Sequence, residues 1–227
     1  MNVSIFLPTR KGSQRAPNKN TRKFGNFEGG LLELKLKQLV RVKNVREIVL
    51  STNDERSMEI AEEFLPKHSK LKVIVRPGHL AASNTKLLDL IDYVPEIVSS
   101  EHILWTHVTS PFCDEKYYNQ AIRDYITGIE DGFDSLVSVR EFKNFLWDPE
   151  EKDIINRKSS SFWPNTQDLK DLFELNNAIF LASRNAYQKD HNRLGSALKL
   201  FEMKKIPSFD IDDEEDFKIA EAIYDKL

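Results

Sequence analysis

Short apolar segments alternate with segments of helical periodicity from residue 3 to residue 139, and this alternation limits the fold more than any other feature of the sequence. The apolar runs have the length of buried strands, whereas the intervening segments repeat apolar residues at helical spacing, as Leu32, Leu36 and Leu39 do. Strands are expected at residues 3–7, 47–51, 72–75, 102–105 and 134–139, and helices at 31–42, 55–64, 86–98 and 115–126.

Strands and helices in this order indicate parallel strand pairing, because a parallel neighbour needs a crossover connection that a helix supplies. The sequence therefore predicts an α/β fold of three layers, αβα, with helices on both faces of a mostly parallel sheet. Ligands bind such sheets at the carboxyl ends of the strands. The loops that follow the strands are therefore the places to look for a functional site.

The pattern loosens after residue 139. Residues 142–173 contain Pro149, Pro164 and a run of three serines, and we expect them to form a small excursion that serves as a lid or a dimerisation arm. Regular structure is predicted again at 175–181 and 199–206, followed by a final helix at 213–226. Residues 1–227 are thus expected to form one domain.

Composition argues against several functional classes. A net charge of −3 gives no electrostatic case for a nucleic-acid partner. No apolar run reaches the roughly 18 residues of a membrane-spanning helix, and the N-terminal residues lack the features of a signal peptide. Cys113 is the only cysteine, which fits a reducing compartment. We expect a cytoplasmic protein without a membrane or nucleic-acid partner.

The loop after the first strand combines cations with a glycine. Arg10, Arg15 and Lys19 can neutralise phosphate charge, and Gly12 allows a positive φ or a close backbone approach. Exposed backbone N–H groups in such a loop form an anion-binding concavity, and Asn20 can contact a base or a ribose. This composition suits a triphosphate, although a solvated basic loop without a ligand is the alternative.

This loop resembles the signature of the CMP-sugar synthetases. These cytidylyltransferases activate sialic acid, the related legionaminic and pseudaminic acids, and 3-deoxy-manno-octulosonate. Their pattern is Arg-x-Gly-Ser-Lys-x-x-Pro-x-Lys-Asn, and Gln14 departs from it, so one phosphate contact is missing or comes from Arg15. The resemblance implies a Rossmann-like nucleotidyltransferase domain that binds the nucleotide through Arg10, Gly12, Ser13, Arg15, Lys19 and Asn20.

Two further segments are similar to the family in the same order. Residues 49–55 match its second strand and the Ser-Thr-Asp-Asp-Glu that follows, with Asn53 in place of an aspartate; capping of the next helix by Asn53 or Asp54 is the alternative role. Residues 76–85 resemble Arg-Pro-x-x-Leu-Ala-x-Asp-x-Ala/Ser, which implies that Arg76 and Ser83 hold the cytidine half. Helix capping by Ser83 and Thr85 is the alternative there.

Two segments correspond to the sugar site of the family. Residues 104–112 resemble Leu-Gln-Pro-Thr-Ser-Pro-Leu, with Thr109 retained and His107 replacing the glutamine; we expect His107 to titrate near neutrality and to bind sugar, or else to be structural. Residues 174–180 resemble Asn-Gly-Ala-Ile-Tyr, which implies sugar-site roles for Asn176 and Phe180. Asn177 replaces the glycine, and asparagine tolerates the left-handed backbone of a turn.

The acidic segment near the C-terminus resembles the family's Ile-Asp-Ile-Asp-x-x-x-Asp-Phe. In an extended segment residues i and i+2 face the same way, so Asp210 and Asp212 present two carboxylates together. Carboxylate oxygens suit Mg²⁺, which also binds substrate phosphates. The resemblance implies that Asp210 and Asp212 bind Mg²⁺, whereas an acidic helix start without a metal is the alternative.

The resemblance as a whole implies that the chain transfers CMP from CTP to a 2-keto sugar acid and releases pyrophosphate, with Arg10, Lys19 and Asp212 as its catalytic residues. It also implies a homodimer, Mg²⁺ as cofactor and a place in polysaccharide biosynthesis. The acceptor is expected to be of the nonulosonic type. Two alternatives stay open: a transferase of the same fold for another nucleotide or acceptor, and a nucleotide-binding protein with degraded catalysis.

Overall fold

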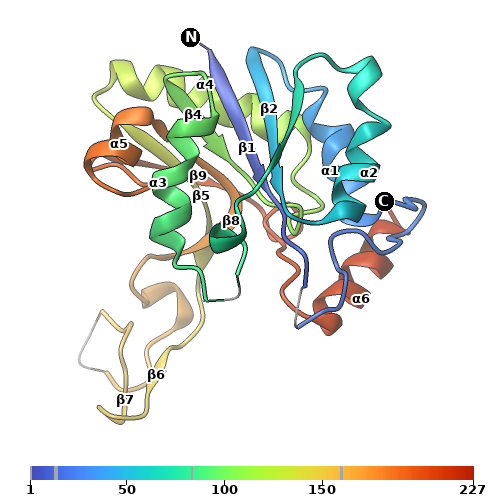
Figure 1. Ribbon diagram of the computed structural model, residues 1–227. Coiled ribbons are helices and arrows are strands. Elements are labelled where there is room, and N and C mark those ends of the chain that lie inside the picture. Colours follow the sequence, from blue (N-terminus) through green and yellow to red (C-terminus); the bar gives the residue numbers. More distant parts are fainter. Residues whose placement is uncertain (1, 13–14, 83, 159–160) are drawn as a thin grey trace.

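A seven-stranded sheet, in the order β3-β2-β1-β4-β8-β5-β9, lies at the centre of the molecule (Figure 1). The computed structural model describes residues 2–12, 15–82, 84–158 and 161–227. All neighbouring strands are parallel except β8, which runs antiparallel to both β4 and β5. The prediction of a mostly parallel sheet is confirmed. The strands are β1 Val3–Pro8, β2 Val45–Thr52, β3 Leu71–Val75, β4 His102–Trp105, β5 Ser135–Phe142, β8 Leu172–Ser183 and β9 Leu198–Glu202.

Helices cover both faces of this sheet, as the alternating side chains of β1 make clear. Val3, Ile5 and Leu7 pack with residues of α1, α2, α4 and α6, whereas Phe6 packs with residues of α3 and α5. The αβα layers expected from the sequence are therefore confirmed. The helices are α1 Gly30–Leu39, α2 Glu55–Glu62, α3 Leu87–Ile97, α4 Glu115–Glu130, α5 Arg184–Lys189 and α6 Glu214–Tyr224, with short 3₁₀ turns at Leu65–Lys67, Gly78–Leu80 and Thr166–Asp168. None of the helices in the described residues has the length and apolar character required to cross a membrane.

Helix starts only partly follow the sequence expectation. Asp54 occupies the N-cap of α2, but its carboxylate accepts from Ser57 Oγ at 2.7 Å and from no helix N–H group. Lys86 is the N-cap of α3, and the hydroxyl of Thr85 donates instead to the His79 carbonyl at 2.9 Å. Thr85 therefore does not cap α3, and this alternative for Thr85 is excluded, whereas the acidic start of α6 does form a cap, through Asp213.

The segment 142–173 extends away from the sheet as an excursion (Figure 1). The two ends of this segment are paired with each other in the central sheet, since Phe142 at the end of β5 pairs with Leu172 at the start of β8. Within it, β6 Trp147–Asp148 and β7 Asp153–Ile154 form a small hairpin. Several large apolar side chains of the excursion are exposed, namely Phe145, Trp147, Ile155, Phe162 and Trp163.

The segment after the first loop is fixed against the last helix, although the two lie at opposite ends of the sequence (Figure 1). The ring of Phe24 meets those of Phe217 and Tyr224 edge-on, each with 5.4 Å between centroids. The guanidinium of Arg22 lies 3.7 Å from the centroid of the Phe217 ring and pairs with Glu214 at 2.8 Å. These contacts hold the first loop beside the acidic segment that precedes α6.

Candidate functional site

A cavity of about 450 Å³ opens at the carboxyl ends of the strands. Thr9 follows β1, Arg76 follows β3 and His107 follows β4, so the cavity lies where a parallel sheet is expected to bind a ligand. Asn177 of β8 and the segment after β9 complete its wall. Nine residues singled out from the sequence line this cavity: Arg10, Arg15, Lys19, Asn20, Arg76, His107, Thr109, Asp210 and Asp212.

The cationic loop and the acidic segment meet in this cavity. Lys19 Nζ donates to the Ile211 carbonyl at 2.7 Å and to the Asp212 carbonyl at 3.2 Å. Arg15 Nη2 donates to Asp212 Oδ1 at 2.6 Å. Burial lowers the pKa of Lys19, and the charges of Asp210 and Asp212 oppose that shift. The site thus combines two cationic side chains with a pair of carboxylates, as an anionic ligand with a bound cation would require.

The first loop turns at residues that tolerate a left-handed backbone. Gly12 has φ +84°, as expected for this position, and Asn18 has φ 53°. The backbone N–H of Lys11 donates to Asn53 Oδ1 at 3.0 Å, so Asn53 anchors the loop and does not cap α2. Ser13 and Gln14 lie outside the described residues.

Asp210 and Asp212 both line the cavity, whereas Ile211 between them is fully buried, which confirms the expected alternation. Asp210 Oδ2 accepts from Asn177 Nδ2 at 2.6 Å, and its Oδ1 is buried without a hydrogen-bond partner among the described residues. Burial raises the pKa of Asp210, and the hydrogen bond from Asn177 opposes the shift. Asp210 therefore retains a buried oxygen that a cation can satisfy.

His107 differs from the sequence expectation. Its Nε2 accepts from the indole N–H of Trp105 at 2.9 Å. Burial, followed by the charges of Arg193, Arg76, Lys19 and Lys35, lowers the pKa of His107 to about 3. The expected titration near neutrality is wrong, because burial and the neighbouring cations disfavour the protonated imidazole. His107 lines the cavity as a neutral imidazole.

Arg76 reaches the cavity from a buried position. Its Nη2 donates to the Ser51 carbonyl at 2.6 Å and its Nε to Ser51 Oγ at 3.3 Å. Burial lowers the pKa of Arg76 to about 10, which leaves it charged at neutral pH. The end of β2 thus fixes the orientation of the guanidinium. Ser83, expected to act with Arg76, lies outside the described residues.

Asn176 and Phe180 do not line the cavity. Asn176 Oδ1 accepts from Ser138 Oγ at 2.6 Å and from the Ala178 N–H at 3.1 Å, beside an irregularity in the pairing of β5 with β8. Phe180 is buried in the core on the face of α3 and α5. Asn177 lies in the extended strand β8 and has no positive φ, so the expected turn is wrong. Asn177, and not Asn176, contacts the acidic segment.

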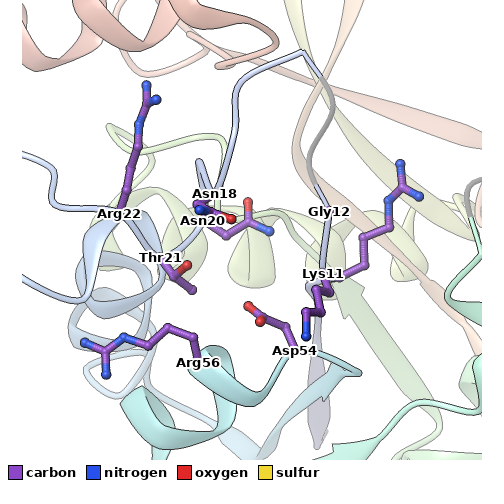
Figure 2. A pocket seen from close by; sticks show the side chains of 9 residues that line it. Lys11, Gly12, Asn18, Asn20, Thr21, Arg22, Asp54 and Arg56 are labelled. Atoms are coloured by element: carbon purple, nitrogen blue, oxygen red, sulfur yellow. The ribbon is translucent and has the colours of Figure 1, made fainter.

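A second cavity of about 290 Å³ lies on another side of the first loop and shares Arg10 and Asn20 with the first (Figure 2). Thr21 and Asp54 point toward its middle from opposite sides, whereas Arg22 points away (Figure 2). Gly12 lines this cavity rather than the larger one. The first loop therefore forms a partition with a polar cavity on each side.

Known proteins share both the sequence pattern and the fold. Over 230 residues the chain is 23% identical to an N-acylneuraminate cytidylyltransferase of Streptococcus agalactiae serotype V, covering 96% of the chain but 52% of the relative. It thus spans about half the length of that enzyme. Over 229 residues it is 24% identical to the CMP-N,N'-diacetyllegionaminic acid synthase of Campylobacter jejuni, covering 97% of the chain and 94% of the relative.

Two solved structures show the same fold at low sequence identity. A CMP:2-keto-3-deoxy-manno-octonic acid synthetase complexed with CTP has a TM-score of 0.69 at 13% identity, over 100% of this chain and 99% of that one. The 4-diphosphocytidyl-2C-methyl-D-erythritol synthase of Anaerococcus prevotii has a TM-score of 0.64 at 14% identity, over 98% of each chain. The family model for cytidylyltransferases matches residues 5–226, nearly the entire chain. This match, together with the order of the motifs around the cavity, shows that the chain belongs to the cytidylyltransferase family.

Proposed function

We propose that this protein transfers CMP from CTP to the anomeric hydroxyl of a 2-keto sugar acid of the nonulosonic type. The observation that carries the proposal is the meeting of the cationic first loop with the acidic segment: Lys19 Nζ lies 2.7 Å from the Ile211 carbonyl, and Arg15 lies 2.6 Å from Asp212. Opposite charges gathered in one cavity at the carboxyl ends of the strands suit a triphosphate and a cation.

In the proposed reaction the anomeric oxygen bonds to the α-phosphorus as the bond to the β-phosphate oxygen breaks. Pyrophosphate leaves with the electron pair of the broken bond, and the hydroxyl proton passes to water. Such a transfer depends on position and charge neutralisation and needs no protein nucleophile. In agreement, burial raises the pKa of the sole cysteine, Cys113, to about 11, and Cys113 does not line the cavity.

The phosphates are assigned to the first loop. Arg10 and Lys19, which both line the large cavity, would neutralise the phosphate oxygens. Lys19 is already oriented by two carbonyl groups of the acidic segment. Arg15 is bound to Asp212 through an exposed pair, which contributes little free energy and can exchange the carboxylate for a phosphate.

Asp210 and Asp212 are the residues that would hold Mg²⁺. The described residues contain no cluster of three or more acidic, histidine or cysteine side chains suited to a metal. Two carboxylates nevertheless fit Mg²⁺, which keeps several waters and shares substrate phosphates, and the unpartnered Oδ1 of Asp210 suits such a ligand. When bound, Mg²⁺ would supply charge stabilisation for the reacting phosphates.

The two substrates are assigned to different walls. Asn20 and Arg76 are proposed to contact the cytidine half, together with Ser83 outside the described residues. His107 and Thr109 are proposed to contact the sugar acid. Asn176 and Phe180 are left out of the proposed site, since neither lines the cavity.

The excursion is proposed to join two copies of the chain into a homodimer. Trp147 is 55% exposed and Trp163 69% exposed, together with other large apolar side chains of the segment 142–173. An exposed apolar group of this kind is typical of a protein interface. We further place the enzyme in the cytoplasm, where CTP is made, and in polysaccharide biosynthesis, which consumes activated sugars.

Pyrophosphate release tests the activity. The purified protein is incubated with Mg²⁺, one of CTP, UTP, GTP or ATP, and sialic, legionaminic, pseudaminic or 3-deoxy-manno-octulosonic acid. We expect release with CTP and a nonulosonic acid, and its loss in Lys19→Met. Preference for another nucleotide would favour a different transferase. Calorimetric binding of CTP without release for any acceptor would favour degraded catalysis.

A further inference from the structure

A half-buried arginine packs against Trp105, which lines the large cavity. Arg193, between α5 and β9, places its guanidinium carbon 3.6 Å from the centroid of the Phe180 ring and 5.0 Å from that of the Trp105 ring. Its Nη1 is buried and has no hydrogen-bond partner among the described residues. Contact with the faces of two aromatic rings compensates part of the desolvation of this charge. Arg193 thus braces the indole of Trp105 from behind the cavity.

Trp105 in turn determines how His107 carries its proton. An indole N–H only donates, so the 2.9 Å contact to His107 Nε2 requires that Nε2 be unprotonated and accept. A neutral imidazole has one proton, which must then be on Nδ1. Nδ1 has no hydrogen-bond partner in the described part of the chain, and His107 lines the cavity. The N–H group at Nδ1 is therefore available to a ligand.

The charges around His107 act in the same direction. The cations that act on its pKa are Arg193 in the α5–β9 connection, Arg76 at the end of β3, Lys19 in the first loop and Lys35 in α1. All four are cations, and each disfavours a second proton on the imidazole. A second proton would also convert Nε2 into a donor facing the indole N–H and would break that hydrogen bond.

We propose that Trp105 and Arg193 are positioning residues that hold His107 as a neutral donor, with its N–H at Nδ1 directed to an uncharged oxygen of the sugar-acid acceptor. This inference rests on the proposed function. A neutral N–H donor suits a hydroxyl or an amide carbonyl of the acceptor, whereas the carboxylate of the acceptor would gain more from a cation. His107 thereby selects acceptors that carry such an oxygen at this point.

The tautomer is tested first, in a measurement that needs no turnover. Long-range ¹H–¹⁵N correlation spectra of the whole protein, with the His107 signals assigned from His107→Gln, are recorded between pH 5 and 9. We expect a proton on Nδ1 throughout. In Trp105→Phe we expect the proton to distribute over both nitrogens, and in Arg193→Met we expect His107 to titrate at higher pH. A wild-type proton on Nε2 would overturn the proposal, whether or not the variants fold.

Kinetics test the function of this arrangement. We expect Arg193→Met, Trp105→Phe and His107→Phe to raise the KM for the acceptor about tenfold, the loss of one hydrogen bond, with the KM for CTP within about twofold. His107→Gln, which keeps an N–H donor, should restore acceptor binding. Lys189→Met on α5 is the matched control, since this side chain is exposed and does not line the cavity.

Two outcomes would overturn the proposal in different ways. A rise in the KM for CTP instead of that for the acceptor would place His107 at the nucleotide. Absence of pyrophosphate release with every acceptor, while the spectra still report a proton on Nδ1, would refute the proposed function and the acceptor role with it.

Discussion

Replacement of Asp212 by alanine separates function from folding. The side chains of Arg15 and Asp212 are 67% and 53% exposed, and an exposed ion pair contributes about 0–1 kcal/mol. The backbone N–H of Asp212, which donates to Asp216 at 3.0 Å, stays in the variant. We therefore expect the free energy of unfolding to fall by less than about 1 kcal/mol and Tm by less than about 4 °C.

Activity should respond far more strongly. Asp212→Ala removes one of the two carboxylates proposed to hold Mg²⁺, and a bound metal stabilises the reacting phosphates by several kcal/mol. We expect kcat to fall by about 100-fold or more and the Mg²⁺ concentration for half-maximal rate to rise. Pyrophosphate release at saturating CTP and acceptor, titrated with Mg²⁺, measures both. A fully active Asp212→Ala would remove this residue from the mechanism.

The neighbouring acid provides the matched control. Asp213 caps α6, because its Oδ1 accepts from the N–H groups of Glu215 at 2.9 Å and Asp216 at 3.0 Å. Loss of such a cap costs about 1 kcal/mol, so Asp213→Ala should lower Tm by about 2–4 °C and leave kcat unchanged. Equal losses of activity in both variants would refute the reasoning, since a local disturbance of the segment would then explain them.

Three further predictions concern other parts of the molecule. Burial alone would raise the pKa of Glu47, but its hydrogen bonds lower this pKa from 4.5 to about 2. The carboxylate therefore contributes about 3 kcal/mol to the free energy of unfolding above pH 4.5, and this contribution is lost as the pH falls toward 2. Urea unfolding of Glu47→Gln should show a lower free energy of unfolding than the wild type at pH 7 and a smaller decrease of that free energy in acid. An equal decrease in both proteins would contradict this. Because burial lowers the pKa of His107 to about 3, rates of wild type and His107→Gln should have parallel pH profiles from 5 to 8. A second inflection in the wild type alone would argue against a neutral His107. Trp163→Ser should shift the dimer toward monomer in light scattering, and an unchanged mass would leave this ring outside the interface.

The five strands expected in the first 140 residues all form, each within three residues of the expected ends. Their apolar runs are buried whichever neighbours they acquire, so periodicity alone is sufficient to find them. The excursion at 142–173 was also predicted, from its prolines and serines, since these residues disfavour regular elements. In contrast, α5 was missed, because its six residues are too few to establish a helical period.

The local sequence pattern also led to wrong predictions for specific residues of the site. Asn177 was interpreted as a turn residue, but pairing across the sheet keeps it extended and directs its amide to Asp210. Phe180 was assigned to the sugar site, but the alternation of β8 turns it into the core. No feature of the sequence indicated a role for Arg193, since a single arginine in a polar connection has the sequence pattern of a solvated loop.

The sequence by itself determined the α/β class, the order of most elements, and the chemical character of the cationic loop and the paired aspartates, because these depend on short-range periodicity and on residue type. Only the tertiary structure decided that β8 inserts antiparallel between β4 and β5, and that a loop near residue 15 lies beside a carboxylate at residue 212. It also decided that His107 stays neutral. Strand order, contacts between distant segments and burial of charge all depend on long-range packing, and no local pattern of residues encodes that packing.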